Sequence, residues 1–261
     1  MTTTATSSDG TAIAFDVIGD GPPVVLVAGI FCTRHTLAPL AAALSDAGLR
    51  AATYDRRGRG DSGGGGLAPP PAEAIAREVE DLAAVAGALG GDVAVYGHSS
   101  GACVAARATG TQLRVRRLVL HEPPWSDDDP DGSLRLDRTI RAAIDEQRLG
   151  DAITAFLGET GMPPEVLAGV AADPAMLAVA PTMPYDLAAT GADGSIPADL
   201  LATIAVPTLV VAGTASPPFF LRTAEQVTAL IPGATLERLE AADHGAPADQ
   251  VAPAIAPFLT T

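Results

Sequence analysis

The sequence has few cysteines and no long apolar run. Its two cysteines, Cys32 and Cys103, lie far apart in 261 residues and outside any metal-ligand spacing. We therefore expect two buried thiols, with neither a disulfide nor a metal. No apolar run approaches the roughly 20 residues that a membrane span needs. Met1–Gly10 lacks the basic and apolar regions of a signal peptide. These absences predict a soluble cytoplasmic protein with no membrane partner.

Basic residues are also scarce. The chain has 16 Lys and Arg against 31 Asp and Glu, a formal net charge of −15, and a pI near 4.4. Nucleic acids and anionic membrane surfaces repel such a chain, so we exclude both as partners. The densest acidic run, Asp127–Asp131, contains a proline and no liganding periodicity, which predicts a solvated loop rather than a calcium site. The oligomeric state stays open.

The stretch Val93–Gly101, Val-Ala-Val-Tyr-Gly-His-Ser-Ser-Gly, carries a chemical motif. An apolar run ends in this glycine-rich turn, and a small-residue helical segment, Ala102–Ala108, follows at once. This is the GxSxG pattern in the setting it requires, strand then sharp turn then helix. Gly97 and Gly101 would remove collisions between the strained turn and its neighbours. The pattern predicts Ser99 as a nucleophile, and a glycine-rich connection without chemical meaning is the alternative.

Strands and helices alternate along most of the chain. Residues 2–18 predict an antiparallel edge hairpin, with a turn at 8–10. Apolar runs predict buried strands, and periodic segments predict helices between them. The strands are expected at 24–28, 50–55, 116–121, 207–212 and 235–240 besides the one before Ser99, and the helices at about 35–47, 71–89, 198–204, 218–230 and up to 259. This order predicts an α/β fold, a mostly parallel sheet with helices on both faces and ligands at the carboxyl ends of its strands.

The segment 126–190 has a different character. It contains helical patterns at 134–149, 151–158 and 165–171 and no convincing strand. We expect a helical cap at 126–190, inserted into one core domain formed by residues 1–125 and 191–261. Apolar residues in or beside this segment predict an apolar substrate pocket beneath it, because methionine-rich surfaces adapt to varied hydrophobic ligands. They are Trp125, Phe156, Met162, Met176 and Met183.

These parts, in this order, resemble the α/β-hydrolase fold family over nearly the whole chain. Besides the turn at Ser99, residues 55–62 (Asp-Arg-Arg-Gly-Arg-Gly-Asp-Ser) look like the family's DxRGxGxS turn. Asp243-His244-Gly245 looks like its histidine-bearing loop. The resemblance implies a cap where 126–190 falls. It gives the arginine-rich turn no catalytic role and implies that this turn ties loops together near the site.

The resemblance also implies residue roles, with no cofactor. Ser99 is the nucleophile, His244 the base, and the backbone N–H groups of Ile30 and Ser100 form the oxyanion hole. The family often carries His-Gly after the first long core strand, whereas this chain has Ala28-Gly29. Because the donor there is a backbone N–H, the hole does not depend on that histidine. The other histidines are interpreted as structural or site-lining: His35, His98 and His121.

The acid of the triad is missing from its usual place. In the family it follows the strand after the cap, and residues 213–218 of this chain (Gly-Thr-Ala-Ser-Pro-Pro) contain no carboxylate. Some branches of the family place the acid after the strand before the cap, where this chain has Glu122. We therefore predict that Glu122 orients His244, since a catalytic imidazole needs a partner on its second ring nitrogen.

Other partners for Glu122 and for His244 remain open. Glu122 could instead pair with Arg116 or Arg117 at its own strand. Asp186 is a weaker candidate for the acid, and Ser216 could donate a hydrogen bond but not a charge. Asp243 adjoins His244, and neighbouring side chains in an extended loop point apart.

A serine nucleophile indicates acyl transfer. Dehalogenation and epoxide opening, which resemble it on this fold, use an aspartate at the turn. We predict hydrolysis of an ester or thioester of a small, largely apolar molecule through an acyl-enzyme. Two alternatives stay open. One is carbon–carbon bond hydrolysis, and the other is a non-hydrolytic or catalytically silent protein that binds a small apolar metabolite, which the missing carboxylate at 213–218 favours.

Overall fold

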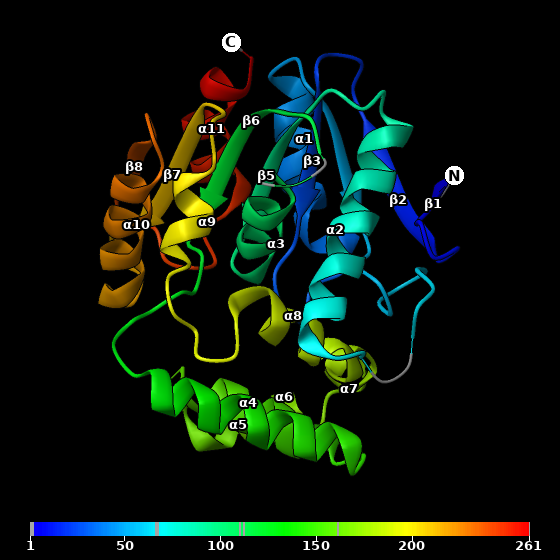
Figure 1. Cartoon of the computed structure of the whole chain (residues 1–261), viewed down its shortest axis with the longest axis vertical. Helices are drawn as coiled ribbons and strands as arrows, with labels where there is room; N and C mark the ends of the chain where they lie inside the picture. The colour runs from blue at the N-terminus through cyan, green and yellow to red at the C-terminus, as the bar shows by residue number, and fades with distance from the viewer. Residues whose placement is uncertain (1–2, 66–67, 110, 112, 161, 261) are drawn as a thin grey trace.

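A computed structural model describes residues 3–65, 68–109, 111, 113–160 and 162–260. Eight strands form one sheet in the order β1-β2-β4-β3-β5-β6-β7-β8 (Figure 1). β1 and β2 pair antiparallel at one edge, β2 also runs antiparallel to β4, and the remaining pairs are parallel. The strands are β1 Thr3–Thr6, β2 Ala12–Ile18, β3 Pro23–Val27, β4 Arg50–Tyr54, β5 Val93–His98, β6 Val115–His121, β7 Thr208–Gly213 and β8 Thr235–Leu239. The predicted α/β fold with a mostly parallel sheet is confirmed.

The central strands are apolar along their whole length because helices cover both faces of the sheet. In β3, Val24 and Leu26 face one helical layer, and Val25 and Val27 face the other. All four side chains are fully buried. A buried apolar strand of this kind stabilises the fold by about 1.5–3 kcal/mol for each such side chain.

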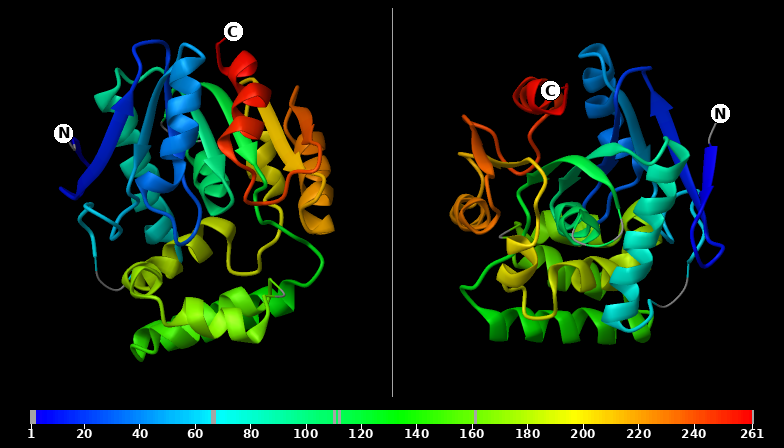
Figure 2. Two further views of the ribbon diagram at one scale, coloured as in Figure 1. Left: turned by 180° about the vertical axis from the view of Figure 1, so that it is seen from behind. Right: turned by 45° about the horizontal axis from the view of Figure 1, so that its top comes forward.

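Two helical layers enclose the sheet (Figure 2). One contains α1 (Ala38–Asp46) and α11 (Ala248–Thr260). The other contains α2 (Pro71–Ala88), α3 (Ser100–Thr109), α9 (Ala198–Ala202) and α10 (Pro218–Leu230). A short 3₁₀ turn, η1 (Arg34–Leu37), precedes α1. The sheet therefore presents its carboxyl-terminal edge between the layers, and the motif residues of the sequence lie there.

Residues between β6 and α9 form helices across that edge (Figure 1). They are α4 Pro130–Asp145, α5 Leu149–Gly158, α6 Pro164–Ala171, α7 Pro174–Val179, η2 Ala180–Thr182 and α8 Met183–Thr190. We call this segment the helical insertion. It has an apolar cluster of its own, centred on residues such as Ile140, Ile153 and Met183. No single helix among the described residues is long and apolar enough to cross a membrane. Residues 164–171 and 174–190, a pair of helical segments bent by 62°, together reach the required length and apolar composition.

The insertion differs in detail from the sequence prediction. α4 begins at Pro130 rather than residue 134, because Asp129 caps it by accepting a hydrogen bond from the Gly132 N–H and proline suits the first helical position. It ends at Asp145, and Gln147 then has a φ of 59°. The helices between 174 and 190 were not predicted. They are short, with a proline in the first turn of each, so they lack a long apolar period, although Asp173 before Pro174 is a capping signal.

Candidate active site

Ser99 sits on the sharp turn between β5 and α3. Its φ is 56°, in the left-handed region that costs a residue with a side chain about 1–3 kcal/mol. A Cβ on Gly97 would lie 2.5 Å from Ala102 Cα, and one on Gly101 would lie 2.2 Å from the Val27 carbonyl oxygen. Both positions therefore require glycine, as the pattern predicted. Ser99 keeps 8% of its surface exposed, so its hydroxyl lies at the edge of the core.

The loop after β8 brings His244 to the same edge of the sheet. His244 Nδ1 lies 2.6 Å from Glu122 Oε2. A carboxylate accepts and does not donate, so Nδ1 carries the proton and Nε2 is the nitrogen left for another partner. Phe220 at the start of α10 stacks on the imidazole, with ring centroids 4.4 Å apart and planes at 14°. The ring of His244 is thus held at its face and at one nitrogen.

Glu122 follows β6 directly and is fully buried. Its second carboxylate oxygen accepts a hydrogen bond of 2.8 Å from the Gly213 N–H at the end of β7. Burial alone raises the pKa of Glu122, but the polar groups that face its carboxylate, His244 first, then the Ser216 hydroxyl and the Gly213 N–H, outweigh it and leave the pKa below its usual value. The carboxylate is therefore charged when His244 is neutral, and it can stabilise an imidazolium.

The alternative partners lie elsewhere. Arg116 is 3.9 Å from Asp92, and Arg117 lies over the ring of Phe258. Asp243 accepts a hydrogen bond of 2.9 Å from the Gly245 N–H in its own loop. Ser216 is buried and makes no hydrogen bond to His244 in the part of the chain that the structure describes. Asp186 binds two arginines, which are considered below.

Two contacts were not predicted from the sequence. His98 Nε2 lies 2.9 Å from the carbonyl oxygen of His244, and the two rings are 4.6 Å apart. Because a carbonyl only accepts, His98 Nε2 must carry the proton. Burial, and then the charge of His244, lower the pKa of His98 to about 4, so His98 stays neutral near pH 7. The sequence predicts only a structural or site-lining role for His98, and nothing in the sequence points to Phe220 beside His244.

The segment after β3, which contains Gly29 and Ile30, passes directly beside Ser99. A Cβ on Gly29 would lie 2.9 Å from Ser99 Cβ. Ile30 follows Gly29, and Ser100 is the first residue of α3, where the backbone N–H has no acceptor within the helix. Within the described residues, neither N–H donates to another protein group. These two donors are therefore available to a ligand beside Ser99.

Left-handed backbone conformations concentrate at this edge of the sheet. Among the described residues other than glycine, five have a positive φ. Three belong to the site: Phe31 at 61°, Ser99 at 56° and Glu122 at 46°. A fourth, Ala241, lies three residues before His244. Such strain persists only where the surrounding structure fixes the backbone, and it clusters at functional sites.

Four of the five apolar residues predicted to form a pocket beneath the insertion belong to one of two apolar clusters of the described residues, and Met162 belongs to neither. Phe156, Met176 and Met183 belong to the cluster of the insertion, against which Ile30 and Phe31 also pack. Trp125 does not line a pocket there. It is fully buried in the core beside α10, and its Nε1–H donates to the Thr190 carbonyl at the end of α8. The prediction for Trp125 was wrong because its large apolar ring is used to close the core behind β6.

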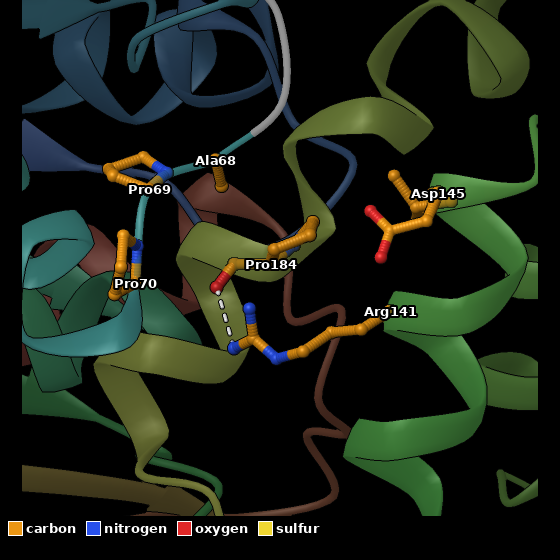
Figure 3. A pocket seen from close by; sticks show the side chains of 7 residues that line it. Ala68, Pro69, Pro70, Arg141, Asp145 and Pro184 are labelled. Carbon is orange, nitrogen blue, oxygen red and sulfur yellow. Dashed lines mark hydrogen bonds between the residues drawn. The ribbon is translucent and has the colours of Figure 1, made fainter.

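A cavity of about 250 Å³ lies between the insertion and the segment before α2 (Figure 3). Its lining residues are Ala68, Pro69, Pro70, Arg141, Ile144, Asp145 and Pro184. Arg141 donates to both oxygens of Asp137 and to the Pro184 carbonyl, and thereby joins α4 to α8. Neither Ser99 nor His244 lines this cavity, so we give it no part in the chemistry.

Among the described residues, no three His, Cys, Asp or Glu side chains are grouped so that they could hold a metal ion. Cys32 is half-buried and Cys103 is buried, and both are free thiols.

A sequence model described as the alpha/beta hydrolase family matches residues 24–256. The chain belongs to the alpha/beta hydrolase family. Among solved structures, this hydrolase is similar to an alpha/beta hydrolase from Sphaerobacter thermophilus DSM 20745, with 44% identity, a TM-score of 0.85, and coverage of 98% of this chain and 99% of that one. No curated protein matches this hydrolase.

More distant structures share the fold. A hydrolase from Pseudomonas aeruginosa PA01 has 26% identity and a TM-score of 0.75, over 100% of this chain and 98% of that one. A thermophilic esterase from Thermogutta terrifontis has 23% identity and a TM-score of 0.73, over 99% and 98%. The last likeness concerns the fold alone.

Proposed function

We propose that this alpha/beta hydrolase cleaves an ester or thioester of a small, largely apolar molecule, with Ser99, His244 and Glu122 as its catalytic triad. The observation that carries the proposal is the 2.6 Å hydrogen bond between His244 Nδ1 and Glu122 Oε2, beside a serine held at a φ of 56°. The bond fixes the tautomer of His244 so that Nε2 can accept a proton.

In the proposed mechanism, Ser99 Oγ attacks the acyl carbonyl carbon while His244 Nε2 takes the hydroxyl proton. The carbonyl oxygen becomes an oxyanion, to which the N–H groups of Ile30 and Ser100 donate. His244 then gives its proton to the leaving alcohol or thiol, and an acyl-enzyme remains. Water, activated by His244, releases the acid and restores Ser99. In the free protein Ser99 Oγ makes no hydrogen bond to His244 within the described residues, and such bonds commonly tighten when substrate binds.

The apolar character of the proposed substrate is supported by the surroundings of Ile30, an oxyanion-hole residue, and of its neighbour Phe31. Ile30 and Phe31 pack against the cluster of the insertion, and Phe31 meets Phe156 edge to face at 5.8 Å. We further propose that residues 126–190 act as a cap over the site. Esterase chemistry in the name of the Thermogutta terrifontis structure agrees with the proposal, as does an enol-lactonase from Burkholderia xenovorans LB400 of the same fold.

Turnover of p-nitrophenyl butyrate and labelling by a fluorophosphonate test the proposal. We expect the wild-type protein to release p-nitrophenol and to take up one label on Ser99. Ser99→Ala should keep the circular dichroism spectrum and lose about 10⁶-fold in kcat, as removal of the nucleophile does in a serine protease. An active, folded Ser99→Ala protein would rule out the covalent mechanism. A wild-type protein without turnover or labelling would favour the binding-protein alternative.

A further inference from the structure

Two buried arginines of the turn after β4, Arg56 and Arg59, lie behind the segment 28–32. Each is 1% exposed. Asp186 on α8 lies between them, with one carboxylate oxygen on Arg56 Nη1 and the other on Arg59 Nη2. Arg56 also forms a two-pronged ion pair with Glu78 on α2. Two positive and two negative charges are thus buried together, and the guanidinium planes are fixed by several partners each.

Arg59 also donates to the backbone beside Ser99 and to a side chain of the insertion. Its Nη1 donates to the Gly29 carbonyl at 2.7 Å and to the Cys32 carbonyl at 3.3 Å. Its Nε donates to Thr182 Oγ1 at 2.9 Å. One guanidinium therefore holds both ends of the segment that contains Phe31, whose φ of 61° needs external support.

The Gly29 carbonyl matters because it shares a peptide unit with the Ile30 N–H. A peptide unit is planar and trans, so its C=O and N–H bonds are antiparallel and their directions are fixed relative to each other. An arginine that fixes the Gly29 oxygen also fixes the direction of the Ile30 N–H. A charged donor on the oxygen further polarises the peptide and strengthens its N–H as a donor.

The second donor is oriented in a different way. The Ser100 N–H shares its peptide unit with the Ser99 carbonyl, which accepts a hydrogen bond of 2.9 Å from the Ala102 N–H in the first turn of α3. The helix fixes that donor. The Ser100 side chain, in contrast, donates to Asp186 at 2.7 Å. Asp186 therefore contacts both Ser100, which carries the second donor, and Arg59, which binds the Gly29 carbonyl behind the first.

We propose that Arg59, held by Asp186 of the helical insertion, is a positioning residue that orients the Ile30 N–H of the oxyanion hole. The inference rests on the proposed function and deepens it. Arg59 touches no reacting atom and acts through the Gly29–Ile30 peptide. Because Asp186 and Thr182, which bind Arg59, both belong to the insertion, the direction of the Ile30 N–H depends on the position of the insertion.

Arg59→Lys tests the proposal. Lysine keeps a charge for Asp186 but has no planar fork that reaches Asp186, Thr182 and the Gly29 carbonyl at once. Loss of one oxyanion-hole donor lowers kcat by about 10²–10³-fold, and we expect a fall of up to that size, with KM for p-nitrophenyl butyrate within about threefold. Affinity for butylboronic acid, whose tetrahedral adduct on Ser99 places an oxygen in the hole, should fall by the same factor as kcat/KM. The pH dependence of kcat should not move.

Arg57→Lys is the matched control. Arg57 belongs to the same turn, is also buried, and forms a two-pronged pair with Asp81. In the described residues it makes no hydrogen bond to the segment 28–32. We expect kcat and the affinity for butylboronic acid to stay within about threefold of wild type, even if the protein melts at a lower temperature.

Circular dichroism establishes that the variants are folded. If Arg59→Lys does not fold, Asp186→Asn replaces it, and we expect about a tenfold loss in both kcat and boronate affinity. A folded variant with unchanged kcat and boronate affinity, or with a lower kcat at unchanged boronate affinity, would overturn the role of Arg59 alone. A wild-type protein that neither turns over the ester nor is labelled at Ser99 would overturn the proposed function itself.

Discussion

The two sides of Ser99 contain different kinds of polar group. One, which we call the histidine side, consists of His98, His121, His244 and Glu122. The other, the arginine side, consists of Arg56, Arg59, Glu78, Asp186 and Ser100. On the histidine side His98 and His121 are held neutral, since burial lowers the pKa of both, and one carboxylate faces His244. On the arginine side burial raises the pKa of Asp186, but the charges of Arg56 and Arg59 outweigh it and leave that pKa below its usual value, so Asp186 stays charged near pH 7.

The difference matches what each side must do in the proposed reaction. A proton carrier has to change charge during turnover, so its neighbours must tolerate both states. A group that aims a backbone N–H at an oxyanion works best when nothing around it titrates. The histidine side therefore makes the reaction depend on pH, and the arginine side makes it depend on geometry.

Glu122→Gln should have the largest effect of the changes that separate the two sides. The amide keeps the shape of the carboxylate but cannot stabilise an imidazolium. We expect kcat for p-nitrophenyl butyrate to fall by about 10⁴-fold, as loss of the triad acid does in serine proteases, with an unchanged circular dichroism spectrum.

Ser216→Ala is the control for Glu122, because Ser216 occupies the place where the family usually carries the acid. It should lose no more than a few-fold in kcat. Normal turnover by Glu122→Gln together with a large loss in Ser216→Ala would show that the orienting group is wrongly assigned.

The His98 contact predicts a smaller effect, and one that distinguishes two substitutions. The amide nitrogen of glutamine can take the place of His98 Nε2 and donate to the His244 carbonyl, whereas leucine fills the space without a donor. His98→Leu should lower kcat by about 10–100-fold, because displacing a catalytic group by about 1 Å costs up to 10². His98→Gln should stay within about threefold. Equal losses in both would show that the hydrogen bond does not position His244.

The free energy of unfolding should also depend on pH through His98, which binds at most one proton. The pKa of His98 is about 4 in the folded protein and about 6.5 in the unfolded chain. Between these values the unfolded chain binds a proton that the folded protein does not, so the free energy of unfolding falls as the pH falls from 6.5 to 4. The full contribution is about 3 kcal/mol at most.

Urea unfolding at several pH values measures this slope. His98→Gln should show a shallower slope than wild type in that window, since His121 and the carboxylates remain in both proteins. Parallel curves for the two proteins would mean that residue 98 binds a proton in the folded state as well.

The sequence predicted what depends on local patterns and on strand order. The turn at Ser99 follows from glycines that no other residue can replace, and the parallel sheet follows from apolar strands between helices. The proximity of Glu122 to His244 follows from the place of each residue after its strand, because parallel strands end at one edge. The catalytic roles of these residues are still predictions.

What the sequence did not reveal depends on how loops and side chains meet. Arg59 and Gly29 are thirty residues apart, and only the path of the turn after β4 brings the guanidinium to that carbonyl. Asp186 lies on a helix of eight residues, which is too short to give a clear apolar period. Trp125 was placed beneath the insertion because apolar residues near 126–190 have no pattern that separates the core from a pocket.

Trp125 also gives this protein an internal optical reporter, because it is the chain's one tryptophan. It stands where the insertion leaves the core, and its indole N–H bonds to Thr190, where the insertion returns. Its own carbonyl accepts a hydrogen bond from Thr223 Oγ1 on α10. If the insertion lifts away from the sheet, water reaches the indole and its fluorescence moves to longer wavelength while the helices remain intact. Emission wavelength, recorded beside circular dichroism, therefore separates opening of the insertion from unfolding.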